Sequence, residues 1–407
     1  MKRPPWPKPL AQAAFHGLAG EVVRTIAPES EADPAALLVT FLIGVGSAAG
    51  YGVGFRVGTE HHGTNEFAGI VGASSDGAKG MSKAGLRPVE LAAPDWMHRP
   101  GLSTGEGLVH HVRDPTTGLN KDGEEVVEDR GVSDKRLLVV ETEFAQPLTT
   151  MERPANTLSS TLRQAWDGGD EPLGTLIKNS SETATHAHIS VIGHITAEEL
   201  QRKLTSTDVA NGFANRFLWV CAKRSQELPT GGDLPDSALK RLVTRTRDAI
   251  TYAEGAGELK RSKRAESMWA LEYPRLTRGK PGLLGVVTAR ARPHVMRVAV
   301  IYALLDRSRT VKTQHLKAAL AVWSYAEASA AHIFGNALGD PVADGLLELL
   351  HEHGEKGLTR TQIRDLTNRH KPKMVSAALE LLETHKLARR AVKKQTRGAP
   401  VTRWWAV

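Results

Sequence analysis

The stretch Phe67-Ala-Gly-Ile-Val71 is an apolar run typical of a buried strand, and Gly72-Ala-Ser-Ser-Asp-Gly-Ala-Lys-Gly-Met-Ser82 follows it directly. This second stretch has the features of a phosphate-binding loop. Its glycines let backbone N–H groups turn inward, its lysine supplies a point charge, and a serine that opens a helix can hold Mg²⁺. We expect the loop to bind phosphate through Gly72, Ser75, Gly77, Lys79, Gly80 and Ser82.

The spacing of this loop is longer than the usual G-x-x-x-x-G-K-[ST]. Ala78 stands before Lys79, and two residues separate Lys79 from Ser82. A glycine- and serine-rich surface loop with a solvated lysine is therefore the alternative interpretation. The neighbouring sequence has to decide between the two.

Length and composition limit the class of protein. The chain has 407 residues, of which 41% are hydrophobic, so it can bury the cores of two or three domains. Its net charge of +8 indicates an anionic partner, and nucleic acid is favoured because no basic stretch has the apolar face of a membrane-surface helix. The single Cys221 excludes an internal disulfide and a cysteine-cluster zinc site. With no run long enough to span a bilayer, we expect a cytoplasmic protein without membrane contacts.

The first part of the chain has the signals of an extended arm, and several segments after it have the signals of helices. Residues 1–9 hold four prolines and three basic residues, which predicts an extended arm. Residues 15–26 have helical spacing, and Asp33 is the expected N-cap of a second helix. Ser103 and Glu106 have the spacing of a capping box that opens a further helix, although Glu106 could instead polarise a water in a nucleotide site.

Two other segments have the signals of surface ribbons. Residues 50–57 alternate like an edge strand or hairpin, and residues 114–134 are charged and glycine-bearing, with a hairpin expected around Asp122-Gly123. The adjacent His61 and His62 invite a metal interpretation. Neighbouring side chains of a strand point to opposite faces, so a shared metal is disfavoured.

A second apolar strand ends in carboxylates. It reads Arg136-Leu-Leu-Val-Val-Glu141-Thr-Glu143. The order of strand, glycine-rich loop, helix and apolar strand predicts a parallel sheet with its ligand at the carboxyl ends of the strands. In that arrangement Glu141 would hold Mg²⁺ and Glu143 would orient a water beside the phosphate loop.

Two more apolar strands follow, at 188–196 and 217–221. His194 and Thr196 stand where an ATPase places a polar residue that senses the γ-phosphate. Arg216 comes directly before the last strand, and its planar guanidinium suits a phosphate, including one presented by a neighbouring subunit. An ion pair with a local carboxylate is the alternative role for this arginine.

The chain resembles a family of helicase-like P-loop proteins of unknown function from phages, plasmids and integrated elements, often found with primase-polymerase domains. The resemblance covers about residues 10 to 335. It is carried by Val-Gly-Ala-Ser-Ser-Asp-Gly-Ala-Lys-Gly-Met-Ser, Gly-Leu-Ser-Thr-Gly-Glu-Gly-Leu, Leu-Leu-Val-Val-Glu-Thr-Glu-Phe, Leu-Arg-Gln-Ala-Trp-Asp-Gly-Gly, His-Ile-Ser-Val-Ile-Gly-His-Ile-Thr and Asn-Gly-Phe-Ala-Asn-Arg-Phe-Leu-Trp-Val.

The resemblance implies a RecA-like core and an ATP-driven role in replication or transfer of element DNA. It also implies a homo-oligomer, with a hexameric ring as one form, and a primase or other replication protein as a partner. Lys79 and Ser82 then correspond to the phosphate-loop lysine and hydroxyl, Glu141 and Glu143 to the second acidic motif, and Arg216 to a subunit-bridging arginine. The chain departs from the family pattern in its stretched loop and in Thr196, where relatives often have glutamine.

Beyond a boundary near residue 228 the sequence predicts a layer of amphipathic helices rich in lysine and arginine. Arg290, Arg292 and Arg297 lie in this layer. We expect them on a solvated or nucleic-acid-facing surface, and an arginine that closes over the nucleotide is the alternative.

The last module, residues 340–407, predicts a winged helix-turn-helix. Three short helices are expected, the second opened by a capping box of Thr359 and Gln362, followed by two strands that form a wing. The third helix would enter the major groove of DNA. The expected DNA contacts are Lys371, Lys373, Ser376, Lys393, Lys394 and Arg397. Winged helices also dock on proteins, which is the alternative use.

The sequence as a whole predicts an α/β protein in four parts. These are a basic arm (1–9), a RecA-like P-loop core with a mainly parallel sheet (10–228), a helical lid layer (229–339) and a C-terminal winged helix (340–407). The expected function is that of a DNA-associated, helicase-like ATPase that uses ATP and Mg²⁺ in replication of a mobile element. The alternative is a non-hydrolysing origin-binding or regulatory protein that uses a degenerate nucleotide fold as an assembly platform.

Overall fold

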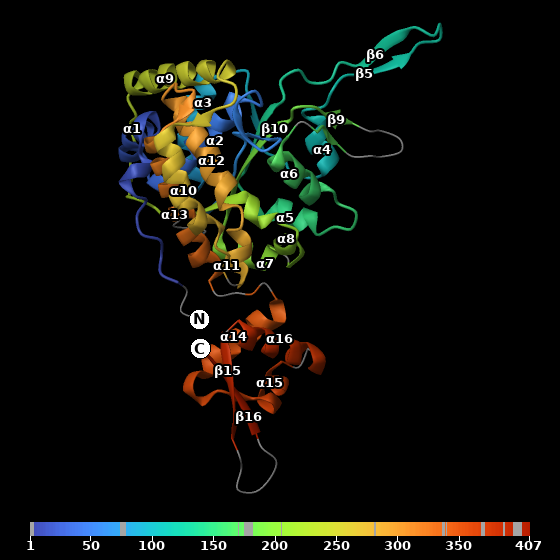
Figure 1. Ribbon diagram of the computed structural model, residues 1–407, viewed down its shortest axis with the longest axis vertical. Helices are drawn as coiled ribbons and strands as arrows, with labels where there is room; N and C mark the ends of the chain where they lie inside the picture. The colour runs from blue at the N-terminus through green and yellow to red at the C-terminus, as the bar shows by residue number, and fades with distance from the viewer. Residues whose placement is uncertain are drawn as a thin grey trace.

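The computed structural model describes residues 4–73, 79–169, 171–174, 182–204, 206–280, 282–335, 338, 340–367, 371–385, 387–393 and 401–407. Within these ranges the protein has a main body and a small C-terminal module (Figure 1). The body is built on one five-stranded sheet, whose strand pairs are all parallel. The predicted α/β class with a mainly parallel sheet is confirmed.

The strands of the central sheet are nearly continuous apolar runs, as is typical of parallel strands covered on both faces. The sequence predicts four of them, and it misses the three-residue edge strand β4. From edge to edge the order is β11 (Phe217–Cys221), β3 (Phe67–Val71), β10 (His188–Ile195), β7 (Arg136–Glu141) and β4 (Met97–Arg99).

Each face of this sheet carries its own hydrophobic core. Ala68, Ile70 and Ile192 point to the first face, and Phe67 and Val191 point to the second. The first face is covered by α1 (Gly17–Ile26), α2 (Pro34–Ala49), α3 (Arg87–Ala92), α9 (Asp236–Glu254), α12 (Ala291–Leu305) and α13 (Thr313–Phe334), with α10 (Lys263–Thr277) against α12 and α13. The second face is covered by α4 (Gly105–His110), α5 (Ala145–Met151), α6 (Leu158–Asp167), α7 (Ala197–Lys203), α8 (Ser206–Ala210) and α11 (Gly282–Val287).

The chain segments that follow β3 and β10 cross opposite faces of the sheet. After β3 the chain enters the 3₁₀ helix η3 (Lys79–Leu86) and α3 on the first face, whereas after β10 it enters α7 and α8 on the second. Right-handed crossovers in the strand order of this sheet require this change of side. The carboxyl ends of β3 and β10 therefore flank the point where an open parallel sheet forms its ligand crevice.

Several helices differ from the expectation. The predicted helix after the glycine-rich loop is η3 followed by α3. The tract from Phe144 to Trp166 forms α5 and α6, and Pro154 lies between them, where it cannot continue a helix. The predicted Asp33 cap is confirmed, because its Oδ1 accepts a hydrogen bond from Ala35 N at 2.9 Å. None of the helices in the described ranges has the length and apolar character to cross a bilayer.

The proline-rich arm, which is predicted to be extended, packs on the body in its described residues 4–9. His332 Nδ1 of α13 donates a hydrogen bond to Pro4 O at 2.7 Å. The ring of Trp6 contacts that of His332 with centroids 5.1 Å apart. The arm therefore lies along the outer side of α13.

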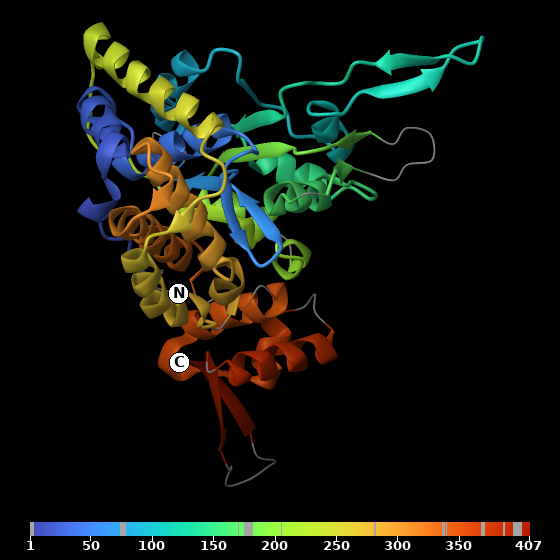
Figure 2. The ribbon, with the colours of Figure 1, turned by 45° about the horizontal axis from the view of Figure 1, so that its top comes forward.

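Small two-stranded pairs lie outside the central sheet of the body. The segment 50–57, where an edge strand or hairpin is predicted, supplies β1 (Gly54–Val57), which pairs with β2 (Glu60–Gly63) beyond the predicted segment. The hairpin predicted around Asp122-Gly123 is confirmed as β5 (Thr116–Leu119) and β6 (Glu125–Asp129), which project away from the body in both views (Figures 1 and 2). Two shorter pairs are β8 (Leu173–Gly174) with β9 (Thr183–Ala184), which is antiparallel, and β12 (Lys260–Arg261) with β13 (Thr310–Val311), which is parallel.

The C-terminal module has its own hydrophobic core. Its three helices and two terminal strands follow in the predicted order, and the short strand β14 between the first two helices is an addition. The Thr359–Gln362 capping box is present, with Gln362 N donating to Thr359 Oγ1 at 3.2 Å and Thr359 N donating to Gln362 Oε1 at 2.9 Å. The strands form an antiparallel sheet in the order β14, β16, β15. The elements are α14 (Pro341–His353), β14 (Leu358–Thr359), α15 (Arg360–Leu366), α16 (Pro372–Thr384), β15 (Ala388–Lys393) and β16 (Val401–Ala406).

Replacing Gly69 by alanine should destabilise the sheet. A Cβ at this position would lie 2.3 Å from the ring of Trp219, which is fully buried and cannot move aside. We expect a loss of about 1–3 kcal/mol in the free energy of unfolding, measured by urea denaturation. The control is Gly52→Ala, where a Cβ meets no atom within 4 Å. Equal stability of the two variants would contradict the tight β3–β11 packing.

Candidate functional site

The predicted phosphate loop starts at the carboxyl end of β3, one of the two strands that flank the ligand crevice. Gly72 N donates to Ile195 O at 3.2 Å, which extends the β3–β10 pairing to the end of both strands. Gly80 lies in η3, where an added Cβ would meet no atom within 4 Å. Ser75, Gly77 and the side chain of Lys79 lie outside the described residues, so their phosphate contacts stay a prediction.

Ser82 lies in η3 with its side chain buried. Its Oγ is 3.2 Å from Nε2 of His194. In β10 His194 is two residues after Ile192, so it points to the same, first face of the sheet, the side on which η3 packs. The two polar residues, predicted separately, are thus brought together at the carboxyl edge.

Glu141 ends β7 on the other side of the sheet. Its strand neighbours Leu137 and Val139 belong to the core of the second face, so alternation places Glu141 on that face. The buried carboxylate Oε1 accepts hydrogen bonds from the backbone N–H groups of Gly101 at 2.6 Å and Leu102 at 2.5 Å. Its role in this conformation is to hold the loop that follows β4.

Glu143 and Thr196 are the other two residues predicted for this edge of the sheet. Glu143 is exposed and lines an open cavity of about 660 Å³, together with Ser103, Arg153 and Glu199. Thr196 is the N-cap of α7, since Glu199 N donates to Thr196 Oγ1 at 3.1 Å. The hydroxyl of Thr196 donates to Glu199 Oε2 at 2.9 Å. In the structure Thr196 therefore caps the N-terminus of α7.

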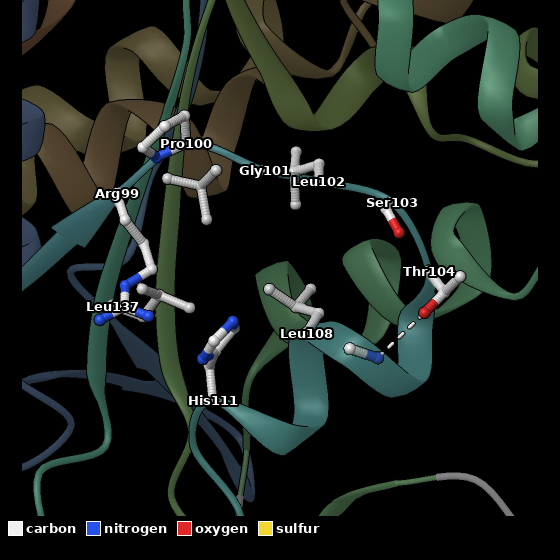
Figure 3. Close-up of a pocket in the computed structure, with 11 residues that line it drawn as sticks. Arg99, Pro100, Gly101, Leu102, Ser103, Thr104, Leu108, His111 and Leu137 are labelled. Carbon is white, nitrogen blue, oxygen red and sulfur yellow. Dashed lines mark hydrogen bonds between the residues drawn. The ribbon is translucent and has the colours of Figure 1, made fainter.

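A second cavity of about 210 Å³ adjoins the same loop (Figure 3). Arg99 and His111 stand at one side of it, and Leu137 belongs to its apolar wall. Burial lowers the pKa of His111, and the nearby Arg99 lowers it further, which favours the neutral imidazole. No local sequence signal points to this cavity, because its walls come from β4, β7 and α4.

The capping box predicted at Ser103 and Glu106 is wrong by one residue. Thr104 is the N-cap of α4, and its Oγ1 accepts from Gly107 N at 3.0 Å (Figure 3). Glu106 instead accepts a hydrogen bond from Thr157 Oγ1 at 2.9 Å, which ties α4 to the start of α6. Ser and Thr cap helices almost equally well, so the sequence alone could not choose between the adjacent residues.

Arg216 lies at the opposite, amino edge of the sheet. It precedes β11, and its side chain is buried beside Trp166, with the guanidinium 5.7 Å from the ring centroid. The guanidinium forms an ion pair with Asp167 at 2.5 Å and donates to Gly212 O at 2.6 Å. The local ion pair that was the alternative for this residue is thus present. A role in a neighbouring subunit's site stays a prediction.

The same edge buries charged residues that the sequence places on the surface. Arg297 is fully buried, so its expected solvated position is wrong. Its Nη2 donates to Trp166 O at 2.6 Å, and its guanidinium stacks 3.9 Å from the Trp166 centroid. Burial lowers its pKa to about 10, against the opposing attraction of Glu66 and Asp167. Arg290, half-buried, bonds to Asp167 at 3.0 Å, and Glu66 accepts from Trp166 Nε1 at 2.8 Å.

The described residues contain one group with the arrangement of metal ligands, His16, Asp306 and His315. His315 Nδ1 accepts a hydrogen bond from Lys312 N at 3.1 Å, so its proton is on Nε2, 3.0 Å from Asp306 Oδ2. A metal on Nε2 would require the other tautomer and would break that bond. The group is better explained as a polar link between α1, α12 and α13. Of the adjacent histidines, His62 stacks on the ring of Phe55.

The predicted DNA contacts of the C-terminal module are described in part. Lys371 and Lys373 are exposed at the start of α16. Ser376 accepts a hydrogen bond from Arg360 and donates to Pro372 O at 2.9 Å. Lys394, Arg397 and the side chain of Lys393 lie outside the described residues. Arg360, on α15, is an exposed cation beside α16 that the sequence reading missed because the contact depends on the fold of the module.

A scan of protein-family models gave no family that matches the chain, and a search of curated proteins gave no significant relative.

Replacing Glu141 by alanine should loosen the loop after β4. Two backbone N–H groups would lose a charged, buried acceptor, and we expect the free energy of unfolding to fall by about 2–3 kcal/mol. Hydrogen exchange at Gly101 and Leu102 should become faster. Glu143→Ala is the control, because its side chain is exposed and its removal should change neither quantity. Unchanged exchange in Glu141→Ala would show that the carboxylate does not hold the loop.

Proposed function

We propose that the protein is a DNA-associated, helicase-like ATPase with a RecA-like core and a C-terminal winged helix, acting in replication of a mobile element as a homo-oligomer. The observation that supports it best is the position of the glycine-rich loop. The loop follows β3, a central strand of a parallel sheet, at the point where connections change sides. That is where such sheets place nucleotides.

The chain's own groups suggest how ATP would be held. Backbone N–H groups from Gly72 to Gly80 would surround the phosphates, and Lys79 would neutralise charge on the β- and γ-phosphates. The His194 imidazole, in contact with Ser82, reaches the same edge and would report on the γ-phosphate. Arg216 would need a neighbouring subunit to meet a nucleotide, since it lies at the other edge of its own sheet.

Mg²⁺ is the part of this proposal that the described geometry does not fit. Ser82 and Glu141 would share the ion, yet they lie on opposite faces of the sheet. Ser82 contacts His194, and Glu141 accepts two backbone hydrogen bonds. We therefore assign no hydrolytic step to these two residues together.

This geometry favours a second candidate function, a non-hydrolysing platform. Such a protein would bind nucleotide or DNA and recruit other replication proteins, such as a primase, without turnover. Glu141 would then have a permanent structural role, which is to hold the loop after β4 through its two hydrogen bonds. Phosphate release in the presence of ATP and single-stranded DNA separates the two functions, because only the ATPase should show DNA-stimulated turnover.

The C-terminal module supports the DNA part of the proposal. Its order of helix, short strand, two helices and two strands matches a winged helix, with α16 as the helix for the major groove. Residues 340–407 contain 13 lysines and arginines against 8 acidic residues, a net charge of +5. Exposed Lys371 and Lys373 at the start of α16 would contact phosphates or bases.

Lys79→Ala should abolish ATP binding while leaving the fold intact, because the lysine supplies the positive charge of the loop. The measurement is calorimetric titration with ATP in the presence of Mg²⁺. Lys83→Ala is the matched control, since Lys83 lies in the same 3₁₀ helix and is exposed. If Lys79→Ala and Lys83→Ala bind ATP equally well, the loop is not a phosphate site.

The double variant Lys371→Ala/Lys373→Ala should weaken binding to duplex DNA and lower the salt slope of log K by about 2, one per phosphate contact. Fluorescence anisotropy at several salt concentrations measures both. Lys263→Ala/Arg264→Ala removes two exposed charges from α10 and serves as the comparison. A larger loss in the α10 variant would place the DNA on the helical layer instead.

A further inference from the structure

The β5–β6 hairpin is a ribbon whose residues are mostly exposed. It projects from the body in both views (Figures 1 and 2), and Leu119 and Val127 are 74% and 60% exposed. A two-stranded hairpin is marginally stable in water unless something holds it. Exposed apolar side chains on such an element indicate a contact with another molecule.

Hydrogen bonds fix the hairpin at both ends. At the tip, Asn120 Oδ1 accepts from Asp122 N and Glu124 N, both at 2.9 Å. At the base, Arg113 pairs with Asp129, and Lys135 Nζ donates to Asp114 Oδ1 at 2.7 Å. The ribbon is therefore held in one orientation before any partner binds, which lowers the entropy lost on binding.

The apolar residues lie on one face of the ribbon beside a carboxylate. Leu119 pairs with Glu125, and Thr117 pairs with Val127, so these four side chains share a face. Thr117 Oγ1 donates to Glu125 Oε1 at 2.9 Å. The face thus presents two hydrophobic groups with a carboxylate between them.

The hairpin is acidic on a basic protein. Residues 116–129 contain five acidic residues and one lysine, a net charge of −4. Because the whole chain carries +8, the rest of it carries +12. This acidic ribbon would repel DNA, whereas the basic body of a second copy would attract the ribbon.

Helix α10 carries the complementary pattern. Arg264, Leu271 and Arg278 recur every seven residues, so they form one stripe along the helix and its C-terminal end. Leu271, 83% exposed, is the most exposed large hydrophobic side chain among the described residues. Residues 260–280 contain seven cations and two anions, a net charge of +5. Figure 1 shows α10 across the body from the hairpin of the same chain.

We infer that the β5–β6 hairpin of one copy docks on α10 of a second copy, with Leu119 and Val127 against Leu271 and Glu125 beside them. The acidic charge of the ribbon as a whole is then attracted by Arg264 and Arg278. Two different surfaces meet in this contact, so repetition generates a closed ring or a filament. The inference rests on the homo-oligomer of the proposed function and names the surfaces that form it. A ribbon on a single helix buries a small area, so the contact should be weak and concentration-dependent.

The test is sedimentation velocity of the full chain over a range of concentrations at low salt. Charge reversal of the hairpin (Glu124→Lys/Glu125→Lys/Glu128→Lys) should weaken assembly at least tenfold. Reversal of the helix (Lys263→Glu/Arg264→Glu/Arg278→Glu) should do the same. Both reversals in one chain should restore assembly, which a loss of folding could not do. Val57→Ser, which changes an exposed apolar residue outside both surfaces, is the control and should assemble like the wild type.

A monomeric wild type at every concentration would overturn the inference, as would a hairpin reversal that assembles normally. If each reversal weakens assembly and the combination fails to restore it, the pairing of these two surfaces is wrong. Titrating the same variants with ATP separates this inference from the proposed function. Normal ATP binding with unaltered assembly refutes only the docking surface, whereas absent ATP binding with hairpin-dependent assembly refutes only the ATPase.

Discussion

The structure depends on the complete burial of β3 as an interior strand of the parallel sheet. Its two edges pair with β10 and β11, and its two faces pack into the separate cores below and above the sheet. A strand enclosed in this way has one register and one direction, since a one-residue slip would exchange the side chains of the two cores. The glycine-rich loop that leaves β3 is consequently held at a fixed place, next to the end of β10.

The main-chain architecture could be predicted from sequence because its signals are local. The apolar runs of β3, β7, β10 and β11, the Asp33 cap and the Thr359 capping box each depend on a few neighbouring residues. The arrangement of the site depends on the packing of distant segments. Ser82 meets His194 across 112 residues of sequence, and Glu141 meets a loop that follows a strand too short to recognise. Which face a strand residue points to is known only once the strand is placed in its sheet.

Charge is distributed in a way that composition alone conceals. The sequence suggests that arginines of the helical layer face solvent, yet Arg297 is buried against Trp166, with Glu66 close enough to offset part of the burial cost. A buried arginine is tolerated when its donors meet carbonyl groups and its plane meets an aromatic ring. Exposed cations lie on α10 and on the C-terminal module, among other places, while the β5–β6 hairpin is acidic. The proposed contacts with nucleic acid and with further copies of the chain would therefore use separate surfaces.

The most direct test of the central claim is hydrogen exchange of the full chain with and without ATP and Mg²⁺. If the carboxyl edge binds the nucleotide, amides of residues 72–82 and of the end of β10 should exchange more slowly when ATP is present, while amides around Arg216 at the amino edge should not change in the monomer. Protection elsewhere, with the 72–82 segment unaffected by saturating ATP, would contradict the assignment of this edge as the nucleotide site.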